Sequence, residues 1–116
     1  MPSLISLGDE LLRINFDNNR IEFSRTGGRT WLTRYSGSYC GTFSDLVEFD
    51  DEIIALTDKG IYCSSNEGLT WRARCTNSIA KSFDYIQDGG DELLGITFDG
   101  HIYSSSSNGA TWRRQK

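Results

Sequence analysis

Residues 24–31 read SRTGGRTW, residues 64–71 read SSNEGLTW, and residues 105–112 read SSSNGATW. Each copy of this eight-residue stretch, called the box below, has serine first, glycine fifth and threonine–tryptophan last. The boxes hold all the tryptophans of the chain, and they recur at a period of about 40 residues. Self-similarity at such a period indicates a repeat protein, in which each unit packs only against its neighbours.

The repeat continues on both sides of the box. An Asp-Glu pair followed by two aliphatic residues precedes each copy, at 9–12, 51–54 and 91–94. Each repeat contains four short runs of strand composition, separated by turns of Gly, Asp and Asn, which is typical of an all-β protein. We expect first strands at 3–7, 44–49 and 82–87, second strands at 10–16, 52–57 and 92–98, third strands at 20–24, 60–64 and 101–105, and fourth strands at 30–35, 70–75 and 111–115. No helix is predicted.

The second strand of each repeat is apolar on both faces. Leu12 and Ile14 point to one face and Leu11 to the other, and the later repeats copy this arrangement. A sheet that is apolar on both faces must be covered on both, here by the sheets before and after it. We therefore predict one domain, residues 1–116, made of three four-stranded β-propeller blades, with a β-sandwich as the second alternative. The blades are expected at about 1–36, 43–76 and 80–116.

The box is predicted to be a tight hairpin between the third and fourth strands. Its glycine suits a positive φ, and the side chain at the third position can accept hydrogen bonds from turn amides. The tryptophan is expected to begin the fourth strand and bury its ring, with one partner for its indole N–H. We assign a structural role to these residues: Ser24, Thr26, Gly28, Thr30, Trp31, Ser64, Asn66, Gly68, Thr70, Trp71, Ser105, Ser107, Gly109, Thr111 and Trp112.

The boxes resemble the Asp-box, or bacterial neuraminidase repeat, S-x-D-x-G-x-T-W. The resemblance implies a propeller like those of sialidases, sortilin-type receptors and photosystem II stability factors. It also implies that the box lies at the periphery of each blade, away from any binding site. The chain departs from the pattern at the Asp itself, where it has Thr26, Asn66 and Ser107.

Three blades do not close a ring, because propellers have about four to eight blades. The first and last blades of a three-bladed arc expose sheet faces, which mark an interface when they are apolar. A head-to-tail contact between two copies gives six blades. We therefore predict a homodimer that completes a six-bladed propeller, with blade 3 of each copy against blade 1 of the other.

The composition of the chain argues against several classes of function. A net charge of −4 argues against nucleic acid as a partner, and no apolar run reaches the length of a membrane span. Three cysteines without a metal-ligand spacing predict reduced, buried thiols. With no secretory signal apparent, we expect a cytoplasmic protein without cofactor or metal.

Binding residues are expected on the loops at the channel mouth of the propeller, because loops on a rigid scaffold commonly carry function. The loop at 35–43, YSGSYCGTF, is the most suggestive, since its two tyrosines stand among small polar residues. Asp58 and Asp99 are interpreted as turn formers. The ligand-binding candidates are Arg34, Tyr35, Tyr39, Lys59, Arg74, Lys81 and His101.

We expect binding and not catalysis. Sialidases, one of the families that the box resembles, bind a carboxylate with three arginines and use a tyrosine nucleophile. Arg34 and Arg74 with Tyr35 or Tyr39 could imitate part of that set, but no Arg-Ile-Pro motif is present, since Pro2 is the only proline. The sequence therefore predicts a non-enzymatic module that binds a glycan or a protein. The alternatives are a sialidase-like glycoside hydrolase and an assembly or scaffolding factor.

Overall fold

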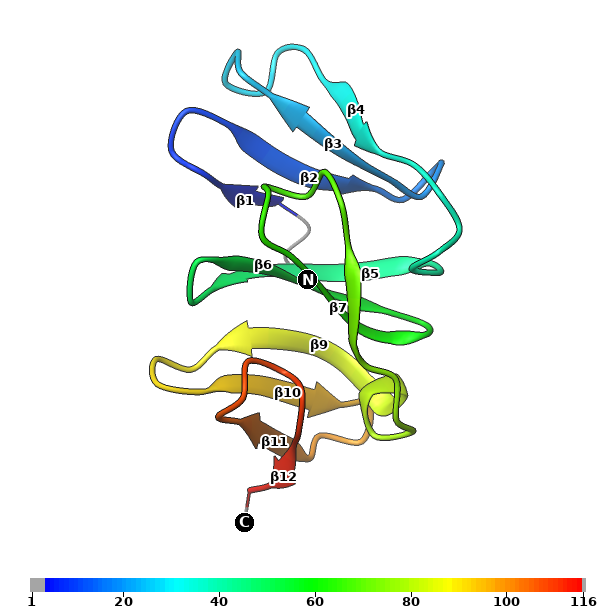
Figure 1. The fold of residues 1–116 in the computed structure, drawn as a ribbon, viewed down its shortest axis with the longest axis vertical. Coiled ribbons are helices and arrows are strands. Elements are labelled where there is room, and N and C mark those ends of the chain that lie inside the picture. Colours follow the sequence, from blue (N-terminus) through cyan, green and yellow to red (C-terminus); the bar gives the residue numbers. More distant parts are fainter. Residues whose placement is uncertain (1–3, 116) are drawn as a thin grey trace.

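Three four-stranded antiparallel sheets are stacked along the long axis of the molecule, which measures 43 × 27 × 23 Å (Figure 1). This computed structural model describes residues 4–115; residues 1–3 and 116, at the ends of the predicted first and third blades, lie outside the described residues. The all-β class and the three four-stranded units predicted from the sequence are confirmed. We call the three sheets blades 1, 2 and 3 in chain order.

Each blade is a meander, in which strands adjacent in sequence pair with one another. Blade 1 contains β1 (Leu4–Ser6), β2 (Leu11–Asn15), β3 (Arg20–Ser24) and β4 (Leu32–Tyr35). Blade 2 contains β5 (Phe43–Phe49), β6 (Glu52–Thr57), β7 (Gly60–Ser64) and β8 (Arg72–Cys75). Blade 3 contains β9 (Phe83–Asp88), β10 (Leu93–Thr97), β11 (Ile102–Ser105) and β12 (Arg113–Arg114).

Two details differ from the sequence prediction. The fourth strands begin at Leu32, Arg72 and Arg113, because the Thr-Trp pair of each box belongs to the turn and does not start the strand. A short 3-10 helix, η1 (Ala80–Ser82), which was not predicted, connects blade 2 to β9. It is closed by hydrogen bonds from Lys81 N to Ser78 O and from Ser82 N to Ile79 O.

The core consists of two apolar layers, one in each gap between blades. Blade 2 contributes alternate residues of β6 to the two layers: Ile53 faces blade 1, whereas Ile54 faces blade 3. This confirms that the second strand is apolar on both faces. The layer between blades 1 and 2 is built from Leu12, Ile14, Ile21, Cys40, Phe43, Leu46, Ile53, Ala55, Tyr62 and Trp71. The layer between blades 2 and 3 is built from Phe49, Ile54, Leu56, Ile61, Cys63, Cys75, Ala80, Phe83, Ile86 and Leu93.

The three cysteines are buried free thiols in these layers, as the sequence predicts. Within residues 4–115, no helix has the length and apolar character needed to cross a membrane.

The box of blade 2 shows how the turn is held. Ser64 Oγ accepts a hydrogen bond from Gly68 N at 2.8 Å, and Asn66 Oδ1 accepts one from Thr70 N at 3.0 Å. Trp71 Nε1 donates to Gly68 O at 2.9 Å. Gly68 has a φ of +90°, which L side chains rarely adopt. The other two boxes repeat these bonds, so the predicted turn chemistry is confirmed.

A buried carboxylate connects the inner strands of blades 2 and 3. Asp45 on β5 is fully buried, and its two oxygens accept hydrogen bonds from Leu46 N and Ile86 N, each at 2.9 Å. Burial disfavours the charged form and raises the pKa of Asp45 to about 6, although both hydrogen bonds act in the opposite direction. This residue therefore ties the second gap together through a group that titrates near neutral pH.

Candidate functional site

The strand order gives every blade two chemically different ends. One end, called the box end, holds the three boxes and the turns between first and second strands, and these turns lie to the left in Figure 1. The loop end, to the right, gathers the turns between second and third strands and the connections from one blade to the next. These are the turns at 16–19, 58–59 and 98–101 and the connections at 36–42 and 76–79.

Hydrogen bonds join the turns of the loop end to the connections between blades. Asn19 donates to Gly41 O at 2.9 Å and accepts from Phe43 N at 2.8 Å. Asp58 Oδ1 accepts from Thr42 N at 2.8 Å. Asp58, interpreted from the sequence as a turn former, thus has a structural role, in which it joins its turn to the connection between blades 1 and 2. The loop end is thus a preorganised platform, because its backbone is fixed by bonds between segments far apart in the sequence.

Three aromatic rings project from this platform into solvent. Phe16 is 59% exposed, Tyr39 is 57% exposed and Phe98 is 75% exposed. The ring of Tyr39 lies edge-on to that of Tyr62, with 5.5 Å between centroids, and Tyr62 Oη donates to Tyr39 O at 3.4 Å. Phe16 and Phe98 were not among the sequence candidates. The sequence feature that could have identified them is an aromatic residue in an otherwise polar hairpin turn. Blade 2 has Asp58 at the equivalent position.

Four of the predicted candidates lie at the loop end. Tyr39 and Lys59 are brought together, since Lys59 Nζ donates to Ser38 O at 3.4 Å. Lys81 lies in η1, and His101 lies at the end of the turn between β10 and β11. The structure thus brings Tyr39 and Lys59 together at the junction of blades 1 and 2, and it places Lys81 and His101 on separate segments.

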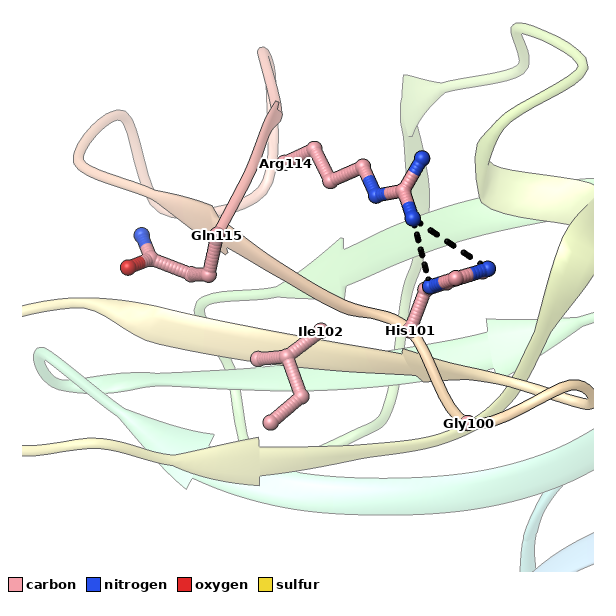
Figure 2. Close-up of a pocket in the computed structure, with 5 residues that line it drawn as sticks. All are labelled: Gly100, His101, Ile102, Arg114 and Gln115. Atoms are coloured by element: carbon pink, nitrogen blue, oxygen red, sulfur yellow. Dashed lines mark hydrogen bonds between the residues drawn. The ribbon is translucent and has the colours of Figure 1, made fainter.

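His101 borders a hollow on blade 3 of about 510 Å³, which is lined by Gly100, His101, Ile102, Arg114 and Gln115 (Figure 2). The guanidinium group of Arg114 points at the imidazole ring, and its Nη2 donates to His101 Nδ1 at 2.7 Å. Asp99 Oδ2 lies 3.5 Å from His101 Nε2. The hydroxyl of Thr97 donates to Asp99 and lowers the pKa of that carboxyl.

Tyr35 is placed differently, because its ring packs in the core between blades 1 and 2. It makes edge contacts with Phe43 at 6.0 Å and with Trp71 at 6.4 Å between centroids. Burial raises the pKa of Tyr35 to about 12, and Cys40 Sγ lies 3.9 Å from its hydroxyl. A phenol in this setting contributes mainly to packing.

Arg34 and Arg74 direct their guanidinium groups to the box end. Arg34 makes two hydrogen bonds to Glu10, at 2.9 and 2.8 Å, and lies 4.0 Å above the ring of Phe23. The bonds from Arg34 hold the pKa of Glu10 below its usual value. Arg74 makes the same bidentate contact with Glu52, at 2.7 and 2.8 Å. The two arginines are therefore separated from Tyr39 and already paired.

Among residues 4–115, no group of three or more His, Cys, Asp or Glu side chains is placed to hold a metal ion. The chemistry offered by the loop end is that of exposed aromatic rings and scattered charges on a fixed backbone. Such a surface is suited to contact another molecule through apolar area and hydrogen bonds.

Comparison with known proteins gives a likeness of fold. No family model matches the sequence, and no curated protein matches it. Among solved structures, YCF48 bound to a D1 peptide superposes with a TM-score of 0.72 at 17% identity, over 90% of this chain. PorZ, a surface component of the type-IX secretion system of Porphyromonas gingivalis, gives 0.72 at 14% identity over 96%. An ancestral GH74 enzyme gives 0.67 at 12% identity over 92%.

These three neighbours are β-propellers, which agrees with three stacked four-stranded blades. The chain spans only 36%, 15% and 16% of their respective lengths. At such identities the likeness concerns the fold, and it transfers neither ligand nor activity.

Proposed function

We propose that this chain is a non-enzymatic protein-binding module, and that its loop end is the binding surface. The observation that carries the proposal is the trio of exposed rings, Phe16, Tyr39 and Phe98, on hydrogen-bonded loops. Aromatic residues are enriched at the centres of protein interfaces, where they bury much area at small entropic cost. That the fold neighbour YCF48 binds a D1 peptide supports a protein ligand.

The same geometry makes a sialidase-like hydrolase the weaker candidate. That reading needs Arg34 and Arg74 beside a tyrosine, to clamp a carboxylate. Both guanidinium groups are instead engaged by Glu10 and Glu52 at the box end. A free carboxylate ligand would have to displace these bidentate pairs.

We further propose that the working form is a homodimer in which two copies complete a six-bladed ring. Blade 3 supports this, because its outward face carries apolar side chains, including Ile102 at 44% exposure. Large exposed apolar surface is usually an interface. A closed propeller would present the exposed aromatic side chains of both copies around one channel mouth. The two copies could then bind one partner together, which strengthens two individually weak contacts.

Quantitative affinity capture from the host tests the proposed function. A variant with Phe16→Ser, Tyr39→Ser and Phe98→Ser is compared with wild type, and each captured protein is then purified and titrated directly. We expect at least one partner whose affinity falls about tenfold or more in the variant, since central aromatic contacts commonly contribute 2 kcal/mol or more. Leu32→Ser, on a residue 63% exposed on the outer strand β4, is the matched control.

Two results would contradict the proposal. One is a partner that is lost in Leu32→Ser but retained in the triple variant. The other is tight binding on a glycan array, abolished by Tyr39→Ser, without any protein partner, which would assign the surface to sugars.

A further inference from the structure

The two internal joints of the arc share one construction. The box of each later blade packs on the second and third strands of the blade before it. A methyl group added at Gly68 would lie 3.2 Å from Leu12 and 3.5 Å from Ile21, both in blade 1. One added at Gly109 would lie 3.2 Å from Ile61 in blade 2. The tryptophan of the same box joins the apolar layer of that joint.

An arginine crosses each internal joint as well. Arg34 of blade 1 donates to Glu67 O in the box of blade 2, at 3.2 Å. Arg74 of blade 2 donates to Asn108 O in the box of blade 3, again at 3.2 Å. The guanidinium groups are fixed by their glutamates, so each joint contains an oriented, charge-assisted hydrogen bond in addition to its apolar layer.

The two ends of the arc carry the two halves of a third such joint. On blade 3, Leu94 and Ile102 hold the positions that Leu12 and Ile21 hold on blade 1. On blade 1, Gly28 holds the position of Gly68, but a methyl group there would meet only Leu11 and Trp31, of its own blade. A second copy of the chain offers each half its counterpart, which is the ring proposed above.

Three positions in this third joint differ from the internal ones. Blade 2 presents Ala55 and Tyr62 toward blade 1. The corresponding residues of blade 1 are Arg13 and Glu22, which pair with each other on β2 and β3, with 2.8 Å between Arg13 Nη2 and Glu22 Oε1. Asn15 Nδ2 adds a bond to Glu22 at 3.2 Å.

The same pair covers the tryptophan of box 1, since the guanidinium group of Arg13 lies 4.0 Å above the ring of Trp31. The third difference is on blade 3, where the residue three positions after the box tryptophan is Gln115 and not arginine. Its side chain bonds Ser104 of its own blade. The third joint therefore has a glutamine where the internal joints have their crossing arginine, and it contains a charged pair. Blade 3 holds its equivalent glutamate, Glu92, through Arg113 instead, at 3.1 Å.

We infer that the ring-closing joint is the weak, reversible one, and that residues 13, 22 and 115 set its strength; this rests on the proposed ring. Closing the joint removes water from the Arg13–Glu22 pair, and desolvating an ion pair offsets much of its attraction. The internal joints have no such cost and retain the arginine. The ring is thus expected to open into intact three-bladed halves, between which a partner can be admitted or released.

Two face variants test the ring itself. Leu11→Asp places a charge on the outward face of blade 1, and Ile102→Asp places one on the outward face of blade 3. Each variant alone is expected to be a monomer in analytical ultracentrifugation. Mixed, they are expected to form a 1:1 complex, because blade 3 of the first variant and blade 1 of the second are both unaltered.

Formation of the mixed complex also shows that both variants are folded. A dimer that is lost in Ile102→Asp but kept in Leu11→Asp would mean blade 3 pairing with blade 3, which overturns the ring. Two natively folded variants, judged by near-ultraviolet circular dichroism, that do not associate on mixing would overturn it as well.

A separate graft tests the inference about strength. Arg13→Ala, Glu22→Tyr and Gln115→Arg together copy the residues of blade 2 into the closing joint. We expect the dimer dissociation constant to fall at least about tenfold, as replacement of desolvated ion pairs by packed side chains commonly gives. The control, Arg72→Ala with Glu48→Tyr, makes similar changes at exposed positions outside this joint. An unchanged or larger dissociation constant in the graft overturns the inference while leaving the ring intact.

Discussion

Asp45 is the residue for which a single substitution has the most specific expected result. It connects β5 of blade 2 to β9 of blade 3 through Ile86 N, and it has no cationic side-chain partner among the contacts described. Asp45→Asn removes the titrating group while keeping the size of the side chain. One of the two backbone donors then loses its oxygen acceptor, which costs about 1–3 kcal/mol at every pH.

The pH-dependent part of the change in unfolding free energy follows from the shift in the pKa of Asp45. The pKa of Asp45 rises from 3.8 to about 6 on folding. Such a shift corresponds to about 3 kcal/mol in favour of the protonated form. A raised folded-state pKa contributes stability that is fully present below pH 3.8 and is lost as the pH rises through 6. The difference in unfolding free energy, wild type minus Asp45→Asn, should therefore fall by about 2–2.5 kcal/mol between pH 4 and pH 7, since part of the effect lies below pH 4.

Urea denaturation at half-unit steps of pH measures this difference. Other carboxylates change stability in both proteins alike and cancel in the subtraction. Ser44→Ala, at the neighbouring exposed position of β5, carries no titrating group and should run parallel to wild type. A difference between wild type and Asp45→Asn that is constant from pH 4 to pH 7 would refute the assignment of this pH dependence to Asp45.

Three further substitutions test the joints and the boxes by chemical denaturation. Trp71→Ala should lower the unfolding free energy by about 3–5 kcal/mol, whereas Trp31→Ala, on the outward face of blade 1, should cost clearly less; equal losses would contradict the packing described. Ser64→Ala should cost about 1–3 kcal/mol, because Gly68 N then has no acceptor in a buried turn, and a neutral result would count against this role. Arg74→Ala should cost about 1.5–3 kcal/mol through its charged hydrogen bonds, and Arg74→Lys should restore only part of it, since lysine cannot make the bidentate contact.

Local rules were enough to predict the blades from the sequence. The glycine of each box, the side chain at its third position and the indole N–H all behave as short-range turn chemistry predicts. The alternation of Ile53 and Ile54 correctly predicted two covered faces. The predicted start of the fourth strand was wrong at the tryptophan of the box. Trp71 was expected to begin the strand, but its indole N–H bonds Gly68 O within the box, and the strand begins at Arg72.

The candidate site was harder to predict, because it depends on directions that sequence spacing does not define. Arg34 was expected near the loop end because it stands directly before the loop at 35–43. It occupies a bulge in the pairing of β3 with β4, and its side chain reaches Glu10 at the opposite end. Phe98 was missed for another reason: an aromatic residue in a turn becomes a candidate only when its exposure is known.

The mass of the protein in solution at micromolar concentration tests the central claim most directly. The claim is that this chain is one half of a six-bladed ring. Native mass spectrometry should find a species of twice the 13.1 kDa chain mass, which dissociates on dilution into folded single chains. A species of 13.1 kDa that stays monomeric and folded at tens of micromolar would contradict it.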